Sequence, residues 1–387
     1  MDRTRRMVLD GLSLAGGGEL EVRENGAAIL PGDEARLEIT DKRAYPAFAC
    51  GGLGAAEAYM AGWWRSPDLA AVMRLLSHNI DAANKMESMR RNWPRQMATW
   101  AKVARAALFP RMTAKRHVGA HYDLDARLFS LFLDNSMSYS CAVYPSPDAS
   151  LETAQQNKLE MLCDALDLRA EDSFLDLGCG WGALSLYAAR TRGCRTTALT
   201  LSRRQHDFLQ QRVAREGLRD KIEVICADYR AAPHRRFNKI ASVEMIEAVG
   251  ARRFGEYFRR FAALLEPGGV GAVQSILIPE SRRAAAERDP DFISVYIFPG
   301  GALPSQETVL SESAAAGLTM RSTKHIGEHY APTLAEWRRR FYANRSVVSR
   351  LGFGERFQRM WEYYFCYCEG GFASGALDNA QFIFSRD

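Results

Sequence analysis

The stretch that decides the fold is Phe174–Gly182, which reads FLDLGCGWG. It joins a short apolar run, typical of a strand buried on both faces, to a turn that contains Gly178, Gly180 and Gly182. Helical periodicity begins directly afterwards and continues to Gly193. A strand, a glycine-rich turn and a helix in this order predict one unit of a parallel sheet, whose ligands bind at the carboxyl ends of the strands. The glycines permit a tight turn and a close approach of the backbone to a ligand.

The alternation of strand and helix extends from Leu151 to the end of the chain. The amphipathic stretch NKLEMLCDALDL precedes the glycine-rich strand, and helical stretches separate the strands that follow it. Alternation at this spacing predicts an α/β fold with a doubly wound, mostly parallel sheet and helices on both faces. The predicted strands are Ser173–Gly180, Arg195–Ser202, Ile222–Asp228, Lys239–Met245, Gly268–Ile278, Thr319–Gly327 and Ala380–Arg386.

The amino-terminal part has a different pattern. Residues 18–43 alternate between apolar and polar, with turn signals at Asn25-Gly26 and Pro31-Gly32, which is typical of short strands. Helical periodicity follows in AAEAYMAGWW and in DLAAVMRLLSHN. We therefore expect a smaller α+β domain over residues 1–112 and the parallel-sheet domain over residues 113–387.

Length and composition limit the classes of protein to which this chain can belong. The 387 residues are 47% hydrophobic and 25% charged, which is a globular composition and excludes a disordered chain. No apolar run reaches the roughly 18 residues that a membrane-spanning helix needs, and the start does not resemble a secretory leader. The eight cysteines lack metal-binding spacing. We therefore expect reduced thiols in a cytoplasmic protein, and no metal site.

Positive charge is concentrated in the segment Lys85–His117. It holds nine Lys or Arg and one Glu, which gives +8, and because the whole chain carries +5 the remaining residues carry −3. Apolar residues with helical spacing lie between these charges, as in a helix that binds an anionic membrane surface. We favour peripheral attachment to the inner face of the membrane over an ordinary surface helix, and expect no nucleic-acid partner.

The glycine-rich turn raises the choice between two classes of cofactor. A dinucleotide site has the spacing GxGxxG and an acidic residue about 20 residues further on. Here the spacing is GxGxG, and the next strand ends in Thr200-Leu201-Ser202 without an acid. Both departures count against a nicotinamide cofactor.

The motif D-x-G-x-G-x-G, from Asp176 to Gly182, resembles the S-adenosylmethionine site of class I methyltransferases. The strands that follow agree with this resemblance. It implies that Asp228 contacts adenine and that Glu244 and Glu247 face the reacting centre.

Longer segments together resemble the cyclopropane-fatty-acyl-phospholipid synthase family, which includes the mycolic acid cyclopropane synthases. They are HYDLDARLFSLFLDNSMSYSCAVY, LDLGCGWGALSLYAA, LTLSRRQHDF, VEMIEAVG, YIFPGGALPS and YYFCYCEGGFASGALDNAQFIFSR. The resemblance implies an enzyme that transfers a methyl carbon from S-adenosylmethionine to the cis double bond of an unsaturated phospholipid acyl chain, which gives a cyclopropane ring. It also implies that the amino-terminal domain binds lipid and forms a homodimer.

The resemblance further implies the site residues, position by position. The expected cofactor contacts are Tyr139, Ser140, Asp176, Gly178, Gly180, Thr200, Gln205, Asp228, Tyr229 and Glu244. In the family, a bicarbonate held by a Cys, a Glu, a His and a Tyr acts as base. The matching residues are Cys141, Glu247 and Tyr330, and Gln274 stands at the position of the His. We expect these four residues to form the catalytic group, with bicarbonate as a second bound group.

Two departures from the family pattern bear on the product. Gln274-Ser275-Ile276 replaces the usual His-Thr-Ile, and Ala248 replaces a second His in the usual FEHVG. These changes resemble a sub-branch that includes plant-type synthases and enzymes that make methylene- or methyl-branched acyl chains, so branched products stay open. Gln274 cannot act as a base, but its amide can hydrogen-bond an oxyanion. Glu247 can orient bicarbonate or take the proton itself.

Less specific interpretations stand beside these. Cys141 could be a core thiol, Glu244 a helix cap and Tyr330 a loop aromatic, whereas a carboxylate at an apolar strand end, such as Glu247, needs a partner. For the whole protein, the alternatives are a methyltransferase acting on a soluble amine or another small molecule, and a non-catalytic lipid- or RNA-binding protein.

Overall fold

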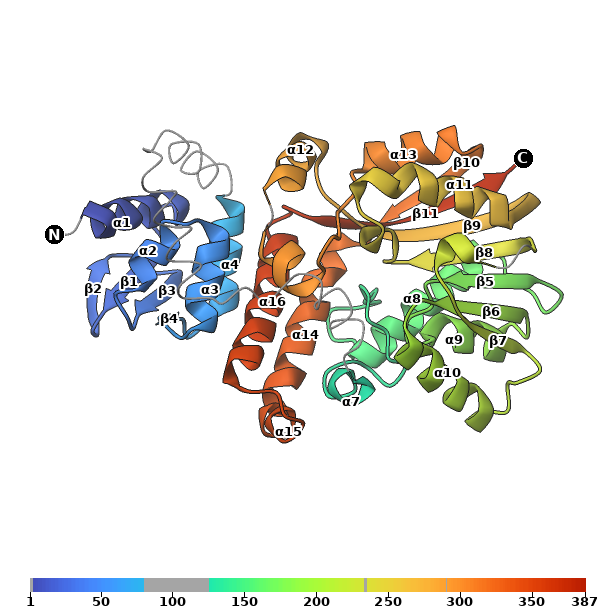
Figure 1. Ribbon diagram of the computed structural model, residues 1–387, viewed down its shortest axis with the longest axis horizontal. Coiled ribbons are helices and arrows are strands. Elements are labelled where there is room, and N and C mark those ends of the chain that lie inside the picture. The colour runs from blue at the N-terminus through green and yellow to red at the C-terminus, as the bar shows by residue number, and fades with distance from the viewer. Residues whose placement is uncertain (1–2, 80–124, 233–234, 290) are drawn as a thin grey trace. The chain divides into compact units, whose positions relative to one another are not determined.

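The computed structural model describes residues 3–79, 125–232, 235–289 and 291–387 (Figure 1). The chain forms two compact units. The first unit comprises Met1–Val118, Pro290–Pro299 and Phe341–Ala376, and the second comprises Gly119–Asp289, Gly300–Arg340 and Leu377–Asp387. The expected division at residue 112 differs from this, because two later segments pack with the amino-terminal part. The basic segment Lys85–His117 lies outside the described residues.

The first unit has α+β architecture. Its four strands have the order β2-β1-β3-β4, in which β1 runs antiparallel to β2 and parallel to β3. The turn between β1 and β2 contains Asn25 and Gly26, both at positive φ, as the Asn-Gly signal predicts. The strands are β1 (Leu20–Glu24), β2 (Ala27–Leu30), β3 (Ala35–Ile39) and β4 (Trp64–Arg65).

Helices complete the first unit, and α1 was not among the predicted elements. Gly370 of α16 lets that helix approach α4 closely, since a Cβ there would lie 2.6 Å from the backbone of Met73 and Arg74. The helices are α1 (Arg3–Ala15), α2 (Ala44–Phe48), α3 (Gly52–Met60), α4 (Leu69–His78), η5 (Ile293–Ile297), α15 (Arg345–Arg350) and α16 (Glu355–Ala373).

The second unit is built on a seven-stranded sheet with the order β10-β11-β9-β8-β5-β6-β7. The five strands from β9 to β7 are parallel, and β11 runs antiparallel to both of its neighbours. This confirms the predicted doubly wound, mostly parallel α/β sheet. The strands are β5 (Ser173–Leu177), β6 (Arg195–Thr200), β7 (Ile222–Cys226), β8 (Phe237–Val243), β9 (Leu265–Leu277), β10 (Leu318–His325) and β11 (Asp378–Arg386).

Apolar side chains cover both faces of this sheet, because neighbouring strand residues point in opposite directions. Phe174 packs with α8 and α9, whereas Leu175 packs with α11 and α13 on the other face. The helices are α7 (Ala126–Phe129), α8 (Leu151–Ala165), α9 (Ala183–Thr191), α10 (Arg203–Arg215), α11 (Phe254–Leu264), α12 (Glu280–Arg288), α13 (Gln306–Ala315) and α14 (Tyr330–Ala343), with short turns η2 (Tyr229–Ala231), η3 (Ile246–Ala248), η4 (Ala251–Arg253) and η6 (Gly327–His329).

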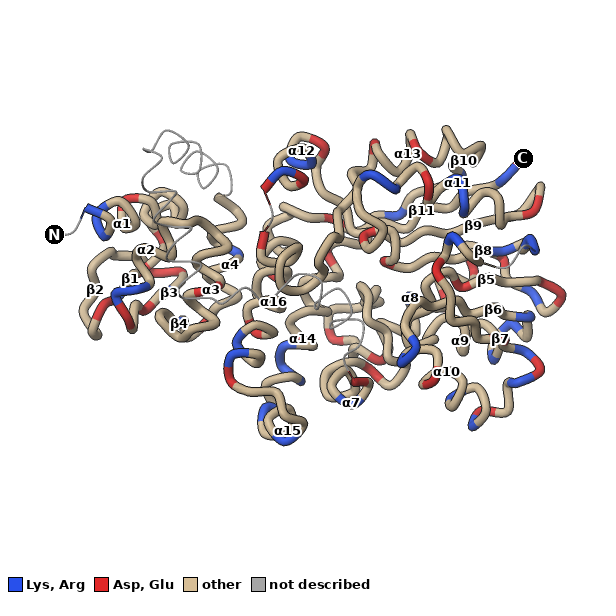
Figure 2. The backbone as a smooth tube through the Cα atoms, in the orientation of Figure 1, with Lys and Arg blue, Asp and Glu red and all other residues tan. Residues whose placement is uncertain are grey.

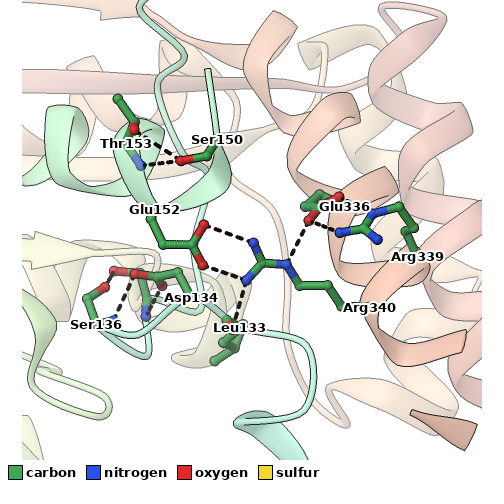
Figure 3. Close-up of polar contacts among 10 residues, drawn as sticks. Leu133, Asp134, Ser136, Ser150, Glu152, Thr153, Glu336, Arg339 and Arg340 are labelled. Carbon is green, nitrogen blue, oxygen red and sulfur yellow. Dashed lines mark hydrogen bonds and ion pairs between the residues drawn. The ribbon is translucent and has the colours of Figure 1, made fainter. Parts of the chain in front are cut away.

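An ion pair fixes α14 to α8 within the second unit (Figure 3). Arg340 donates from both terminal nitrogens to the Glu152 carboxylate, at 2.8 and 2.9 Å, and from Nε to Glu336 at 2.7 Å. It also donates to the carbonyl of Leu133 (3.3 Å). Planar, bidentate pairing of this kind fixes orientation as well as distance. It therefore holds the helix that begins at Tyr330 against the loop that follows α7.

Charge on the described residues is mixed in sign, and Figure 2 shows Lys and Arg interspersed with Asp and Glu along both units. Among the described helices, none is long and apolar enough to cross a bilayer. All eight cysteines are free thiols, as expected.

Candidate active site

The glycine-rich turn follows β5 at the carboxyl edge of the sheet. Gly178 and Gly180 have φ of 83° and 53°, a region that glycine adopts without strain. A Cβ at Gly178 would lie 2.5 Å from Cγ of Met245, whereas a Cβ at Gly180 would meet nothing within 4 Å. The turn therefore contacts the loop after β8 on one side and opens onto free space on the other.

Asp176, the last polar residue of β5, is buried behind this turn. Its carboxylate accepts a hydrogen bond of 2.6 Å from the hydroxyl of Ser185 on α9. Burial raises the pKa of Asp176 to about 6, and the Ser185 hydrogen bond opposes that rise. Asp176 thus holds the turn against α9 at the expected cofactor site.

The next two strand ends carry the residues expected to contact ribose and adenine. The hydroxyl of Thr200 donates to Oε1 of Gln205 (2.7 Å), so the structure brings this pair together. Asp228 accepts two hydrogen bonds from the Arg230 side chain, and these lower the pKa of Asp228. Tyr229 is only 9% exposed and packs in the core, so little of its side chain is accessible to a ligand at this strand end.

The loop before α8 carries Tyr139 and Ser140. The Ser140 hydroxyl accepts a hydrogen bond from the buried Lys158 (2.8 Å), and its carbonyl accepts one from Gln155 (2.9 Å). Burial lowers the pKa of Lys158, and the charges of Glu244, Asp134 and Asp176 oppose this effect. Lys158 therefore joins this loop electrostatically to the ends of β5 and β8.

The carboxylate of Glu244 is the centre of a polar cluster directly after β8. Its Oε1 accepts hydrogen bonds from the Cys141 backbone N–H (2.9 Å), Gln274 Nε2 (2.9 Å) and Asn379 Nδ2 (2.7 Å). Its Oε2 accepts one from the Tyr330 hydroxyl (2.7 Å). We call these four donors and Glu244 the carboxylate cluster. Four donors directed at one acceptor-only group stabilise a carboxylate anion.

Cys141, Gln274 and Tyr330 were expected to group with Glu247 around bicarbonate, and the structure brings them together around the carboxylate of Glu244. The reason is local backbone geometry. Glu244 has φ of 49°, a left-handed conformation that non-glycine residues seldom adopt, and its N–H bonds the carbonyl of Gln274 (2.8 Å). Glu244 is also not the helix cap that a less specific interpretation allowed, since its side chain bonds groups from four separate segments.

Glu247 lies one turn further along, in η3, with different partners. Its Oε1 accepts hydrogen bonds from the Ser275 hydroxyl (3.0 Å) and the Ile276 backbone N–H (2.6 Å). Its Oε2 is buried and has no hydrogen-bond partner among the described residues. Burial, followed by the negative charge of Glu244, raises the pKa of Glu247 to about 8. Glu247 is therefore a neutral acid at pH 7.

The amide of Gln274 is held in place by a residue that the sequence analysis missed. Gln381 on β11 donates from Nε2 to Oε1 of Gln274 (3.0 Å), which leaves Nε2 of Gln274 directed at Glu244. Asn379, also on β11, was missed as well. One signal for both existed, because Asn379 and Gln381 flank Ala380 directly before the apolar run Phe382–Phe384, and buried polar groups need partners.

The thiol of Cys141 does not take part in the carboxylate cluster. Sγ lies 3.2 Å from the carbonyl of Ala142, and only the backbone N–H of Cys141 reaches Glu244. Burial raises the pKa of the thiol, so it stays protonated. The core-thiol interpretation fits the side chain, and the backbone carries the polar contact.

We expect Cys141→Ala to lower turnover by no more than a few-fold, because the backbone donor is kept. Tyr330→Phe removes a donor to a charged acceptor, a contact worth about 1.5–3 kcal/mol, and should lower turnover by about 10- to 100-fold. Initial rates of both variants, with cofactor affinity measured alongside, check this contrast. A Cys141→Ala protein that is less active than Tyr330→Phe would contradict it.

Bicarbonate does not fit the carboxylate cluster. The groups expected to hold it, at Cys141, Gln274 and Tyr330, already donate to the Glu244 carboxylate. A second anion would find these donors taken and would face a like charge. Among the described residues there is also no group of three or more His, Cys, Asp or Glu side chains that could hold a metal ion.

The strand order, the antiparallel β11 and the glycine-rich turn after β5 define a class I methyltransferase fold. Residues 110–382 match the family described as mycolic acid cyclopropane synthetase. The chain belongs to this family.

Individual relatives agree with this assignment. The chain is 37% identical to the tuberculostearic acid methyltransferase UfaA1 of Mycobacterium tuberculosis over 345 residues, which cover 87% of this chain and 79% of the relative. It is 35% identical to the cyclopropane-fatty-acyl-phospholipid synthase of Escherichia coli over 340 residues, which cover 87% of this chain and 84% of the relative.

Solved structures agree as well. The cyclopropane synthase MmaA2 of Mycobacterium tuberculosis has a TM-score of 0.65 and 29% identity, and the match covers 70% of this chain and 98% of that one. The mycolic acid cyclopropane synthase CmaA1, complexed with SAH and CTAB, has a TM-score of 0.65 and 30% identity with the same coverage.

Proposed function

We propose that the protein transfers a methyl carbon from S-adenosylmethionine to the cis double bond of an unsaturated phospholipid acyl chain, and that a cyclopropane ring is the main product. The observation that carries this proposal is the contact of the glycine-rich turn with the loop of the carboxylate cluster. Gly178 abuts Met245, the residue next to Glu244. A cofactor site and a proton-accepting site thus lie side by side.

The residues of the turn fit S-adenosylmethionine. Gly180 leaves open space where any side chain would project, and Thr200 with Gln205 offers polar atoms at the next strand end. The other expected contacts are Tyr139 and Ser140 on the loop before α8, Asp228 and Tyr229 just after β7, and Asp176, which is buried behind the turn. A related structure, CmaA1, was solved with SAH, which supports this choice. When bound, S-adenosylmethionine supplies an electrophilic methyl group.

The protein's own residues would orient the alkene and exclude water. An alkene is a weak nucleophile, so alignment of the reacting carbons contributes much of the acceleration. Addition of the methyl group leaves a carbocation in the acyl chain, which water would quench to an alcohol. The rings of Tyr139 and Tyr330 both pack near Trp337, at centroid distances of 5.2 and 6.2 Å. Aromatic faces such as these stabilise nearby positive charge.

A methylene- or methyl-branched chain is the second candidate product. The similarity to a tuberculostearic acid methyltransferase favours it, as does Gln274 at the position of the family's usual His. Both products pass through the same carbocation. A proton lost from the new methyl group closes the ring, whereas a hydride shift before proton loss gives the branch.

Membrane attachment and self-association are further parts of the proposal. The substrate would be reached at an anionic membrane surface through Lys85–His117, in the cytoplasm, and the first unit would form the homodimer. Mixed charge on the described residues leaves that segment as the main source of excess positive charge. Co-sedimentation with anionic and neutral vesicles tests the attachment, and equal binding to both would reject it.

Fatty-acid analysis of cells that express the protein tests the reaction. Cells that lack cyclopropane lipids are compared with and without expression, by mass spectrometry of total phospholipid acyl chains. A gain of CH₂ with loss of the double bond indicates a ring, a gain of CH₂ with a double bond kept indicates a methylene branch, and a gain of CH₄ indicates a branch that was later reduced. Unchanged acyl chains together with a methylated soluble amine would favour the small-molecule alternative.

A further inference from the structure

We propose that the carboxylate of Glu244 is the base of this reaction and occupies the position at which bicarbonate was expected. The inference rests on the proposed function and deepens it, because it names the group that takes the proton. With Glu244 as the base, the reaction needs no bicarbonate. Loss of a proton to Glu244 is a step common to both candidate products.

The first support is the donor set around Glu244. A backbone N–H, two amides and a hydroxyl converge on its two oxygens at 2.7–2.9 Å. These are the kinds of donor that would hold a small oxyanion, and three of them come from residues expected to hold bicarbonate. The Glu244 carboxylate therefore occupies the place that a bound bicarbonate would take.

The second support is the backbone at Glu244. Its φ of 49° is the left-handed conformation, which disfavours every residue with a Cβ. Such a conformation persists only where the surroundings enforce it, and it is concentrated at functional sites. Here it brings a carboxylate into the cluster, and a glycine would adopt the same backbone without strain.

The third support is the state of the neighbouring acid. Glu247 is protonated at pH 7, because burial and the Glu244 charge raise its pKa to about 8. It cannot accept a further proton on the oxygen that already carries one. Glu244, whose two oxygens receive four hydrogen bonds, is the better-placed acceptor of the two.

The chemistry balances with Glu244 as acceptor. The alkene electron pair forms the new carbon–carbon bond while the methyl–sulfur bond breaks, and sulfur keeps that pair. Glu244 then takes a proton from carbon, and the electrons of the broken C–H bond close the ring or form the new double bond. Glu244 becomes a neutral carboxylic acid and returns its proton to solvent. Because a proton next to a carbocation is strongly acidic, a carboxylate stabilised by four donors suffices.

Bicarbonate dependence is the direct test. Wild-type protein is assayed with S-adenosylmethionine and vesicles of cis-monounsaturated phospholipid, in buffer purged of carbon dioxide and after addition of bicarbonate. We expect the same rate in both. A wild-type rate that collapses without bicarbonate would overturn the proposal, whereas a wild type that transfers no carbon to lipid would reject the proposed function instead.

Glu244→Gly tests whether a small anion can replace the carboxylate. This variant relaxes the backbone and leaves the four donors without an acceptor. At saturating S-adenosylmethionine, we expect it to lose turnover by about 100-fold or more in anion-free buffer, and to regain at least about 10-fold with bicarbonate or formate. Asp167→Gly is the matched control, because Asp167 is also an acidic residue at φ of 49°, and it lies exposed in the turn after α8. It should show no response to either anion.

Glu244→Gln covers the case in which the glycine variant fails to fold. It keeps the side-chain size and removes the basic oxygen, so turnover at saturating S-adenosylmethionine should again fall by about 100-fold. Loss of the base should also redirect the carbocation, so methylated alcohols or isomeric alkenes should appear among the residual products. Wild-type turnover in Glu244→Gln, or a folded Glu244→Gly protein that no small anion restores, would contradict the proposal.

Discussion

Replacing Gly178 by alanine is expected to weaken S-adenosylmethionine binding by about 100-fold, which corresponds to about 2.7 kcal/mol. Two effects add. The backbone at φ of 83° is strained for any residue with a Cβ, and the new Cβ would lie 2.5 Å from Cγ and 2.9 Å from Cβ of Met245. Relief of this clash displaces either the cofactor turn or the loop that carries Glu244, and both belong to the site.

Calorimetric titration of folded protein with S-adenosylmethionine measures this loss. Gly317→Ala is the control, because Gly317 has φ of 79° in the turn before β10 and a Cβ there would meet nothing within 4 Å. It carries the same backbone strain without the clash, so its affinity should equal that of the wild type. Equal affinities for both variants and the wild type would show that the turn does not hold the cofactor.

Replacing Glu247 by glutamine is expected to stabilise the protein at high pH relative to the wild type. The pKa of Glu247 is about 8 in the folded state, above the ordinary value of 4.5, so folding takes up a proton between these values. The wild type therefore loses stability as pH rises from about 4.5 through 8, and the glutamine variant does not. From pH 5 to pH 9 the difference should grow by on the order of 4 kcal/mol, since one pKa unit is worth about 1.4 kcal/mol.

Thermal unfolding of both proteins at pH 5 and pH 9 measures the change, and subtraction cancels the titration of all other groups. One kcal/mol shifts the midpoint of a domain of this size by about 2–4 °C, so a relative shift on the order of 10 °C is expected. Glu160→Gln, on the exposed face of α8, serves as control and should show no such trend. A constant difference between the Glu247→Gln protein and the wild type across this range would mean that Glu247 is not buried as a neutral acid.

Much of the fold could be predicted because its signals are local. The apolar run that ends at Asp176 and the alternation around it indicated the parallel sheet, and each predicted strand corresponds to an observed one. The composition of the first unit could not be predicted in this way. Residues 290–299 and 341–376 join it through long-range packing, such as the close approach of Gly370 to Met73, which periodicity does not reveal.

Some members of the candidate site were predictable from the sequence, but their arrangement was not. Sequence placed Cys141, Gln274 and Tyr330 in one group, and the structure confirms that they meet. Which of two nearby carboxylates they meet depends on one backbone torsion at Glu244, and torsions at a strand end are not encoded by residue type alone. Asn379, which donates to Glu244, and Gln381, which donates to Gln274, come from an antiparallel strand more than a hundred residues away in sequence.

The most direct measurement is the fate of the methyl carbon. Purified protein is incubated with methyl-¹³C S-adenosylmethionine and vesicles of cis-monounsaturated phospholipid, and the acyl chains are analysed by mass spectrometry and NMR. The account predicts one ¹³C atom bonded to the former alkene carbons, in a cyclopropane ring or a branch. Protein that binds the donor but leaves the acyl chains unlabelled, or that places the label on a headgroup nitrogen, would contradict it.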